Sequence, residues 1–261
     1  MIRRKTIQVI ALLYPLWILL LLPSVATAES WVEDELLKQI NDLRLEVVRL
    51  KGRVTVLEQG DVQAKTIVDS PKKPPINIDL TGSALGSNSA DIAIVEFSDF
   101  QCGYCKRFHR STFKKLEDNF INTGKLRYYQ RDFPLDFHDK AFSAAVAARC
   151  VGEQSVDGEG LYWPMRHKLF SNGLPFNEKN YRKTAESVGA DVKKFDACWQ
   201  DGRQQASVMK DIQYGRELSV TGTPQFFVGR IKGGKLVDVI SVTGSQPYNV
   251  FVKHINFLAA K

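Results

Sequence analysis

The sequence predicts an α/β domain that follows an N-terminal α-helical coiled-coil segment. Three observations lead to this prediction. Residues 33–58 contain no proline and carry a seven-residue apolar repeat; residues 92–97 form an apolar run that ends just before two cysteines and an amphipathic helix; and a Thr-Pro pair precedes a second apolar run at 225–228. The chain has 261 residues, of which 44% are apolar, and therefore can bury a sizeable core.

The charge of the chain does not indicate nucleic-acid binding. The formal net charge is +7, but Arg3, Arg4 and Lys5 supply three of the basic residues, and no stripe of lysine and arginine is concentrated elsewhere. We therefore expect no nucleic-acid partner.

The first 28 residues have the pattern of a cleavable signal peptide. Three basic residues precede an apolar run at 7–22, and Ala26-Thr27-Ala28 matches the small-residue pattern before a cleavage site. Because Pro15 interrupts a run that is already short for a membrane span, an uncleaved anchor is the weaker alternative. We expect export to the periplasm, where disulfide chemistry is the ordinary role of cysteine.

Residues 29–59 are predicted to form a coiled-coil oligomerisation helix. β-branched residues at a with leucine at d favour a parallel dimer, although three heptads leave a trimer open. A single amphipathic helix packed on its own domain is the alternative, because the apolar residues Leu37, Leu45 and Val48 lie outside the seam and Gly52 lies within it. A linker at 60–75, rich in proline and lysine, is expected to follow. The predicted seam consists of Leu36, Ile40, Leu43, Val47, Leu50, Val54 and Leu57.

Cys102 and Cys105 are the candidate redox pair. They follow a strand that is predicted to be buried on both faces, and the helix that begins beside them places Cys102 at a helix N-terminus. Unpaired N–H groups and the helix dipole stabilise a thiolate there, so Cys102 can attack a substrate disulfide. Cys105 can then resolve the mixed disulfide. Zinc binding is the alternative for this spacing, but no second close cysteine pair is present in the sequence, and no metal site is predicted.

The chain resembles the DsbA-like thioredoxin-fold family of thiol–disulfide oxidoreductases over residues 76–261. The resemblance implies a catalytic domain with a thioredoxin fold and a helical insertion at about 138–205. Within that insertion, residues 141–147 have the alanine-rich pattern of a tightly packed helix. The motifs that carry the resemblance are Val95-Glu96-Phe97-Ser98-Asp99-Phe100-Gln101-Cys102-Gly103-Tyr104-Cys105, Arg131-Asp132-Phe133-Pro134-Leu135 and Val220-Thr221-Gly222-Thr223-Pro224-Gln225-Phe226-Phe227-Val228.

The resemblance also implies roles for residues around the two cysteines. Thr223 and Pro224 are expected to form a cis peptide that faces the cysteines and binds an extended substrate segment, where the alternative is an ordinary trans proline that starts a strand. Glu96 matches the buried acid that moves the proton of the inner cysteine; burial would raise its pKa, and the alternative is a solvated carboxylate at the end of a strand. Gly103 and Tyr104 are expected to contact substrate.

Asp99 and His109 are weaker candidates. His109 lies four residues after Cys105 on the same predicted helix, but we expect its side chain to be solvated.

Cys150 and Cys198 are expected to form a structural disulfide. Both fall in the predicted helical insertion, and this pairing alone leaves the Cys102–Cys105 pair intact. The bond would close a long loop and stabilise the fold by about 2–4 kcal/mol. Two buried free thiols are the alternative.

Three functions are compatible with the sequence. The first is an oligomeric disulfide isomerase. Gly-Tyr between the cysteines and Thr before the cis proline resemble the pattern of DsbC-type isomerases, and an oligomer that presents several active sites suits isomerisation. A bifunctional oxidase and isomerase fits every feature. The second candidate is a dithiol oxidase recharged by a DsbB-like membrane quinone reductase, whereas an isomerase would need a DsbD-like membrane reductase. The third is a non-enzymatic coiled-coil adaptor or surface protein. Secreted proteins with thiols or disulfides are the expected substrates, and no cofactor is expected.

Overall fold

The computed structural model describes residues 77–155, 160–171 and 173–260, together with eight residues between 39 and 50. The predicted signal peptide (1–28), the linker (60–75) and most of the coiled-coil segment (29–59) lie outside the described residues. Among the described helices, none has both the length and the apolar character needed to cross a membrane.

The eight described residues between 39 and 50 are all helical. Four of them belong to the predicted seam, and their side chains are exposed: Ile40, Leu43, Val47 and Leu50. The coiled coil itself stays a prediction.

The described part of residues 76–261 is built around a six-stranded mixed sheet with the order β1-β6-β5-β3-β4-β2. β3 and β4 pair in parallel, and the other neighbours pair antiparallel. The strands are β1 (Ile78–Asp79), β2 (Ser83–Leu85), β3 (Ile92–Ser98), β4 (Arg127–Asp132), β5 (Gln225–Lys232) and β6 (Lys235–Thr243).

The central strand β3 carries the predicted apolar run. All seven of its residues are buried, because β4 and β5 flank it in the sheet and helices cover both of its faces. Along a strand, successive side chains point to opposite faces. Phe97 packs on one face against Phe133 and Tyr214, so its neighbour Glu96 points to the other face.

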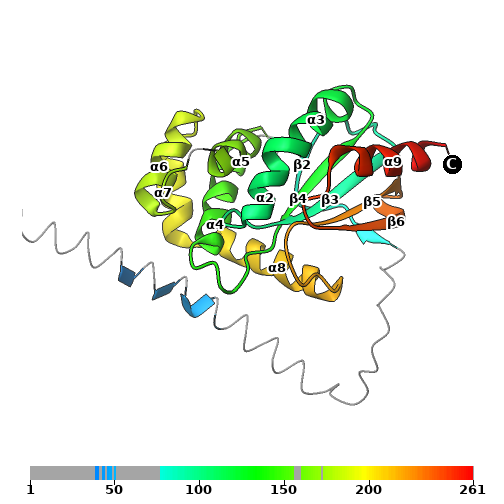
Figure 1. The fold of residues 1–261 in the computed structure, drawn as a ribbon. Helices are drawn as coiled ribbons and strands as arrows, with labels where there is room; N and C mark the ends of the chain where they lie inside the picture. Colours follow the sequence, from blue (N-terminus) through cyan, green and yellow to red (C-terminus); the bar gives the residue numbers. More distant parts are fainter. Residues whose placement is uncertain are drawn as a thin grey trace, which may run out of the picture. The chain divides into compact units, whose positions relative to one another are not determined.

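A long helical segment follows β3 and starts at the two cysteines. It comprises α2 (Gly103–Phe108), the π-helical turn η2 (His109–Phe113), α3 (Lys114–Leu116) and a second π-helical turn η3 (Glu117–Ile121). α9 (Tyr248–Ala259) lies beside this segment, and Phe108 contacts both Phe251 of α9 and Phe226 of β5. The two helices therefore cover one face of the sheet, while α8 (Arg203–Glu217) covers the other (Figure 1).

Four helices lie between β4 and α8 and form a group at one side of the sheet (Figure 1). α4 is rich in alanine, and its small side chains let α5, α7 and α8 pack closely around it. Asn177 and Asp191 cap the N-termini of α6 and α7 by accepting backbone N–H groups. The four helices are α4 (Ala141–Gly152), α5 (Tyr162–Ser171), α6 (Glu178–Ser187) and α7 (Val192–Asp201).

Candidate active site

Cys102 is the N-cap residue of α2 and has an extended backbone (φ −64°, ψ 122°). The preceding strand β3 ends at Ser98, so a short turn carries the chain from the sheet to the helix N-terminus. Cys105 is the third residue of α2 and is fully buried, and Cys102 is 4% exposed. Neither cysteine is in a disulfide.

The two thiols have opposite pKa shifts. A hydrogen bond from Cys105, together with bonds from Thr223 and from the backbone N–H groups of Cys105 and Tyr104, lowers the pKa of Cys102 to about 5 against its burial. Burial raises the pKa of Cys105 well above its ordinary value, and the charges of Glu96 and Cys102 add to this. At neutral pH one sulfur is thus a thiolate nucleophile and the other a protonated thiol.

The Thr223–Pro224 peptide is cis and faces the cysteines. The carbonyl oxygen of Thr223 lies 3.4 Å from Sγ of Cys102. Pro224 is buried. The turn before β5 therefore forms one wall of the site around Cys102.

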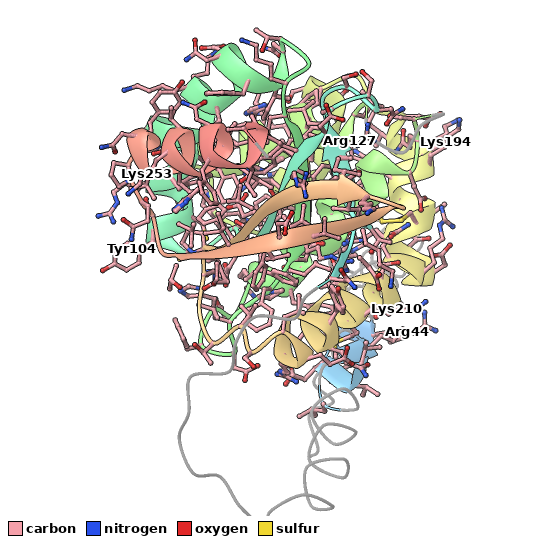
Figure 2. The ribbon with its side chains drawn as sticks, turned by 90° about the vertical axis from the view of Figure 1, so that its right-hand side faces the viewer. Arg44, Tyr104, Arg127, Lys194, Lys210 and Lys253 are labelled. Carbon is pink, nitrogen blue, oxygen red and sulfur yellow. A yellow bond between two sulfur atoms is a disulfide. The ribbon has the colours of Figure 1, made fainter. Side chains whose placement is uncertain are left out.

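Tyr104 presents its ring to solvent beside the two cysteines. It is 59% exposed and points outward at the surface (Figure 2). The Arg107 guanidinium lies 4.9 Å from the centre of its ring. Apart from its chain neighbours and the helix backbone, no atom of the described residues lies within 4 Å of the position that a Cβ on Gly103 would take, so this side of the first turn of α2 is open.

Glu96 is completely buried and is held by two partners that the sequence analysis missed. Oε2 of Glu96 accepts hydrogen bonds from Arg166 (2.9 Å) and from the Tyr128 hydroxyl (2.7 Å). The solvated alternative for this carboxylate is excluded, since both side chains of the Glu96–Arg166 ion pair are 0% exposed. Within the described part of the chain, Oε1 of Glu96 has no hydrogen-bond partner, so this oxygen is free to accept a proton.

His109 is buried, contrary to the expectation of a solvated histidine. Its ring lies between Phe113 and Phe170, and Arg166 approaches Nδ1 to 2.9 Å. Burial, reinforced by the charge of Arg166, lowers the pKa of His109 to about 2. The sequence pattern was misleading because α5, from the helical insertion, covers this face of the active-site helix.

Asp99 accepts four hydrogen bonds beside Cys102, so it has a larger structural role than the sequence indicated. Oδ1 accepts from the backbone N–H groups of Gln101 (2.7 Å) and Cys102 (3.1 Å). Oδ2 accepts from the N–H of Leu135 (2.8 Å) and from Nδ1 of His138 (2.7 Å). One carboxylate therefore ties the start of α2 to the loop between β4 and α4.

Asp99→Asn should destabilise the protein by about 1–3 kcal/mol. The carboxamide replaces one oxygen by a donor, so at least one buried N–H group loses its acceptor. Urea unfolding would measure this, with Asp118→Asn as the matched control, because Asp118 pairs with Lys114 at the surface and its loss should cost less than about 1 kcal/mol. Equal losses of unfolding free energy in the two variants would contradict this role of Asp99.

Cys150 of α4 and Cys198 of α7 form a disulfide with a Cα–Cα distance of 5.6 Å. Both residues are fully buried. The bond joins two helices, α4 and α7, and neither Cys102 nor Cys105 takes part in it.

Comparison with known proteins places these features in a family. Residues 79–239 match the family model described as thioredoxin. The chain is 32% identical over 166 residues to the Na(+)/H(+) antiporter NhaA 1 of Salinispora arenicola, which covers 62% of this chain and 24% of that protein. It is 24% identical over 180 residues to the putative protein-disulfide oxidoreductase of Rickettsia felis, covering 66% and 62%. The chain thus spans less than two thirds of either relative.

A solved structure gives the same result for the fold. The thiol-disulfide exchange protein alpha-DsbA2 from Wolbachia pipientis superposes with a TM-score of 0.55 at 26% identity, over 69% of this chain and 88% of that chain. The predicted α/β fold class is confirmed.

Proposed function

Because this chain belongs to the thioredoxin family, we propose that it is a thiol–disulfide oxidoreductase that acts on protein disulfides in the periplasm. The observation that carries the proposal is the pair of cysteines at the start of α2, one with a pKa of about 5 and the other protonated and buried beneath it. The names of the Rickettsia and Wolbachia proteins support the same activity.

The chemistry follows from the two thiols. The Cys102 thiolate attacks one sulfur of a substrate disulfide, a new S–S bond forms, and the other substrate sulfur leaves as a thiolate. That thiolate or another substrate cysteine can attack the mixed disulfide, which rearranges the substrate without net oxidation. Alternatively, Cys105 gives up its proton and attacks Sγ of Cys102, which releases the reduced substrate and leaves the Cys102–Cys105 disulfide.

We favour disulfide isomerisation by an oligomer, and two features support it. Gly103-Tyr104 and Thr223 match the isomerase pattern of the resemblance. The predicted seam residues Ile40, Leu43, Val47 and Leu50 are exposed in a single chain, as an oligomerisation surface requires. A DsbD-like membrane reductase would keep the cysteines reduced.

A dithiol oxidase is the second candidate, and the pKa of Cys102 favours it. A thiolate stabilised in the reduced protein makes the Cys102–Cys105 disulfide easier to reduce and hence more oxidising. Such an oxidase would be recharged by a DsbB-like membrane partner.

Reactivation of a protein with scrambled disulfides tests the choice between the two. The full chain should restore activity to the scrambled substrate. The double variant Leu43→Glu with Leu50→Glu should lose most of this reactivation, because isomerisation needs the oligomer. The same variant should oxidise a reduced dithiol peptide at the unchanged rate, because oxidation does not need the oligomer. Arg49→Glu, outside the predicted seam, is the control for the added charge. Rapid oxidation of the peptide without reactivation by any variant would assign the oxidase instead, and an inert Cys102 would refute both.

A further inference from the structure

A chain of polar side chains runs from the buried Glu96 toward the surface. Arg166 of α5 contacts Nδ1 of His109 at 2.9 Å, and Nε2 of His109 lies 3.3 Å from Nδ1 of His167. Nε2 of His167 lies 3.4 Å from the carboxylate of Glu117, in η3. Side-chain exposure rises from 0% at Arg166 to 34% at His167.

The first contact fixes the protonation of both imidazoles. A guanidinium has only donors, so Nδ1 of His109 is the acceptor and the neutral ring carries its proton on Nε2. His109 therefore donates to Nδ1 of His167. His167 must in turn carry its proton on Nε2, on the side of Glu117.

The same chemistry excludes a proton wire along this chain. Arg166 has no acceptor atom and keeps its charge, so it blocks proton transfer between Glu96 and His109. These contacts instead fix the orientation of the Arg166 guanidinium. Each of its three nitrogens has a partner from a different element: Nε donates to Gln130 of β4, one terminal nitrogen to His109 of η2, and the other to Glu96 of β3.

We propose that His109 and His167 are positioning residues for the resolving step of thiol exchange, because they hold Arg166 on Oε2 of Glu96 and so keep Oε1 available to the Cys105 proton. This inference rests on the proposed function. In the resolving step the proton of Cys105 passes to Oε1 of Glu96, the Cys105 sulfur bonds to Sγ of Cys102, and the bond from Cys102 to the substrate breaks, releasing a substrate thiolate. The two cysteines together lose two electrons, and the substrate disulfide gains them.

A stopped-flow reaction of the reduced full chain with 5,5′-dithiobis(2-nitrobenzoate) separates the two steps. The first phase, attack by Cys102, releases one chromophoric thiolate; the second, resolution by Cys105, releases another. His109→Phe keeps a ring but removes the acceptor, and it should slow the second phase by about tenfold with the first phase unchanged. His109→Asn restores an acceptor near the position of Nδ1 and should bring the second phase back to within about threefold of the wild type.

Two further variants keep the test decisive. His167→Phe, at the more exposed end, should slow the same phase by about threefold and serves if His109→Phe does not fold. Tyr181→Phe removes a partly buried hydrogen bond elsewhere in the insertion, between the Tyr181 and Ser143 hydroxyls, and should change neither phase. If His109→Phe and His167→Phe both leave the second phase at the wild-type rate, this inference alone is overturned. The same holds if His109→Phe slows the second phase and His109→Asn does not restore it. Absence of both phases in the wild type would instead overturn the proposed function.

Discussion

Alkylation of Cys102 by iodoacetamide should reach half its maximal rate near pH 5, far below the ordinary thiol value of 9.0. Only the thiolate reacts, and the leading cause of its stabilisation is the hydrogen bond from Cys105. Cys105→Ala should therefore move the midpoint upward, while Cys105→Ser, which keeps a hydroxyl donor, should move it less. Mass spectrometry of the alkylated protein at a series of pH values measures the midpoint for the wild type and for both variants. A wild-type midpoint above pH 7 would contradict the geometry of this site.

The same shift predicts how stability depends on pH. Folding lowers the pKa of Cys102, so its contribution to the stability of the reduced protein is fully present above pH 9 and is lost as the pH falls to about 5. The difference in unfolding free energy between the reduced wild type and Cys102→Ser should thus shrink as the pH is lowered through this window. A constant difference would show that folding does not perturb this thiol.

Arg166→Met should lower the free energy of unfolding by about 3–5 kcal/mol, the largest stability effect that we expect from a single substitution here. The change leaves the Glu96 carboxylate charged and buried without its partner. Adding Glu96→Gln to Arg166→Met should recover most of the loss, because the amide carries no charge. Chemical denaturation of the reduced proteins measures both.

A surface ion pair provides the control for Arg166. Arg203 pairs with Glu153, and its side chain is 49% exposed, so Arg203→Met should cost less than about 1 kcal/mol. If Arg166→Met costs no more than Arg203→Met, or if the double variant is as unstable as the sum of the two single changes, the buried pair does not have the energetic role assigned to it.

Local patterns in the sequence predict the parts of the site that neighbouring residues build. An apolar run buries β3, the two-residue spacing places Cys102 and Cys105 in one helical turn, and the thiolate depends on N–H groups within that turn. Glu96 could be predicted as well, because it is the one acid within an apolar strand.

The partners of these residues were decided by tertiary structure alone. Arg166 is 70 positions from Glu96 and 57 from His109, and His138 is 39 from Asp99. In the sequence, Arg166 lies in a segment with ordinary helical composition, and nothing there predicts that its charge is fully buried. Whether a polar side chain meets solvent or a partner depends on which helix packs over it, and the packing of the insertion on the active-site helix brings these distant groups together. Local spacing thus determined which sulfurs react, whereas the fold determined which buried charges and hydrogen bonds control them.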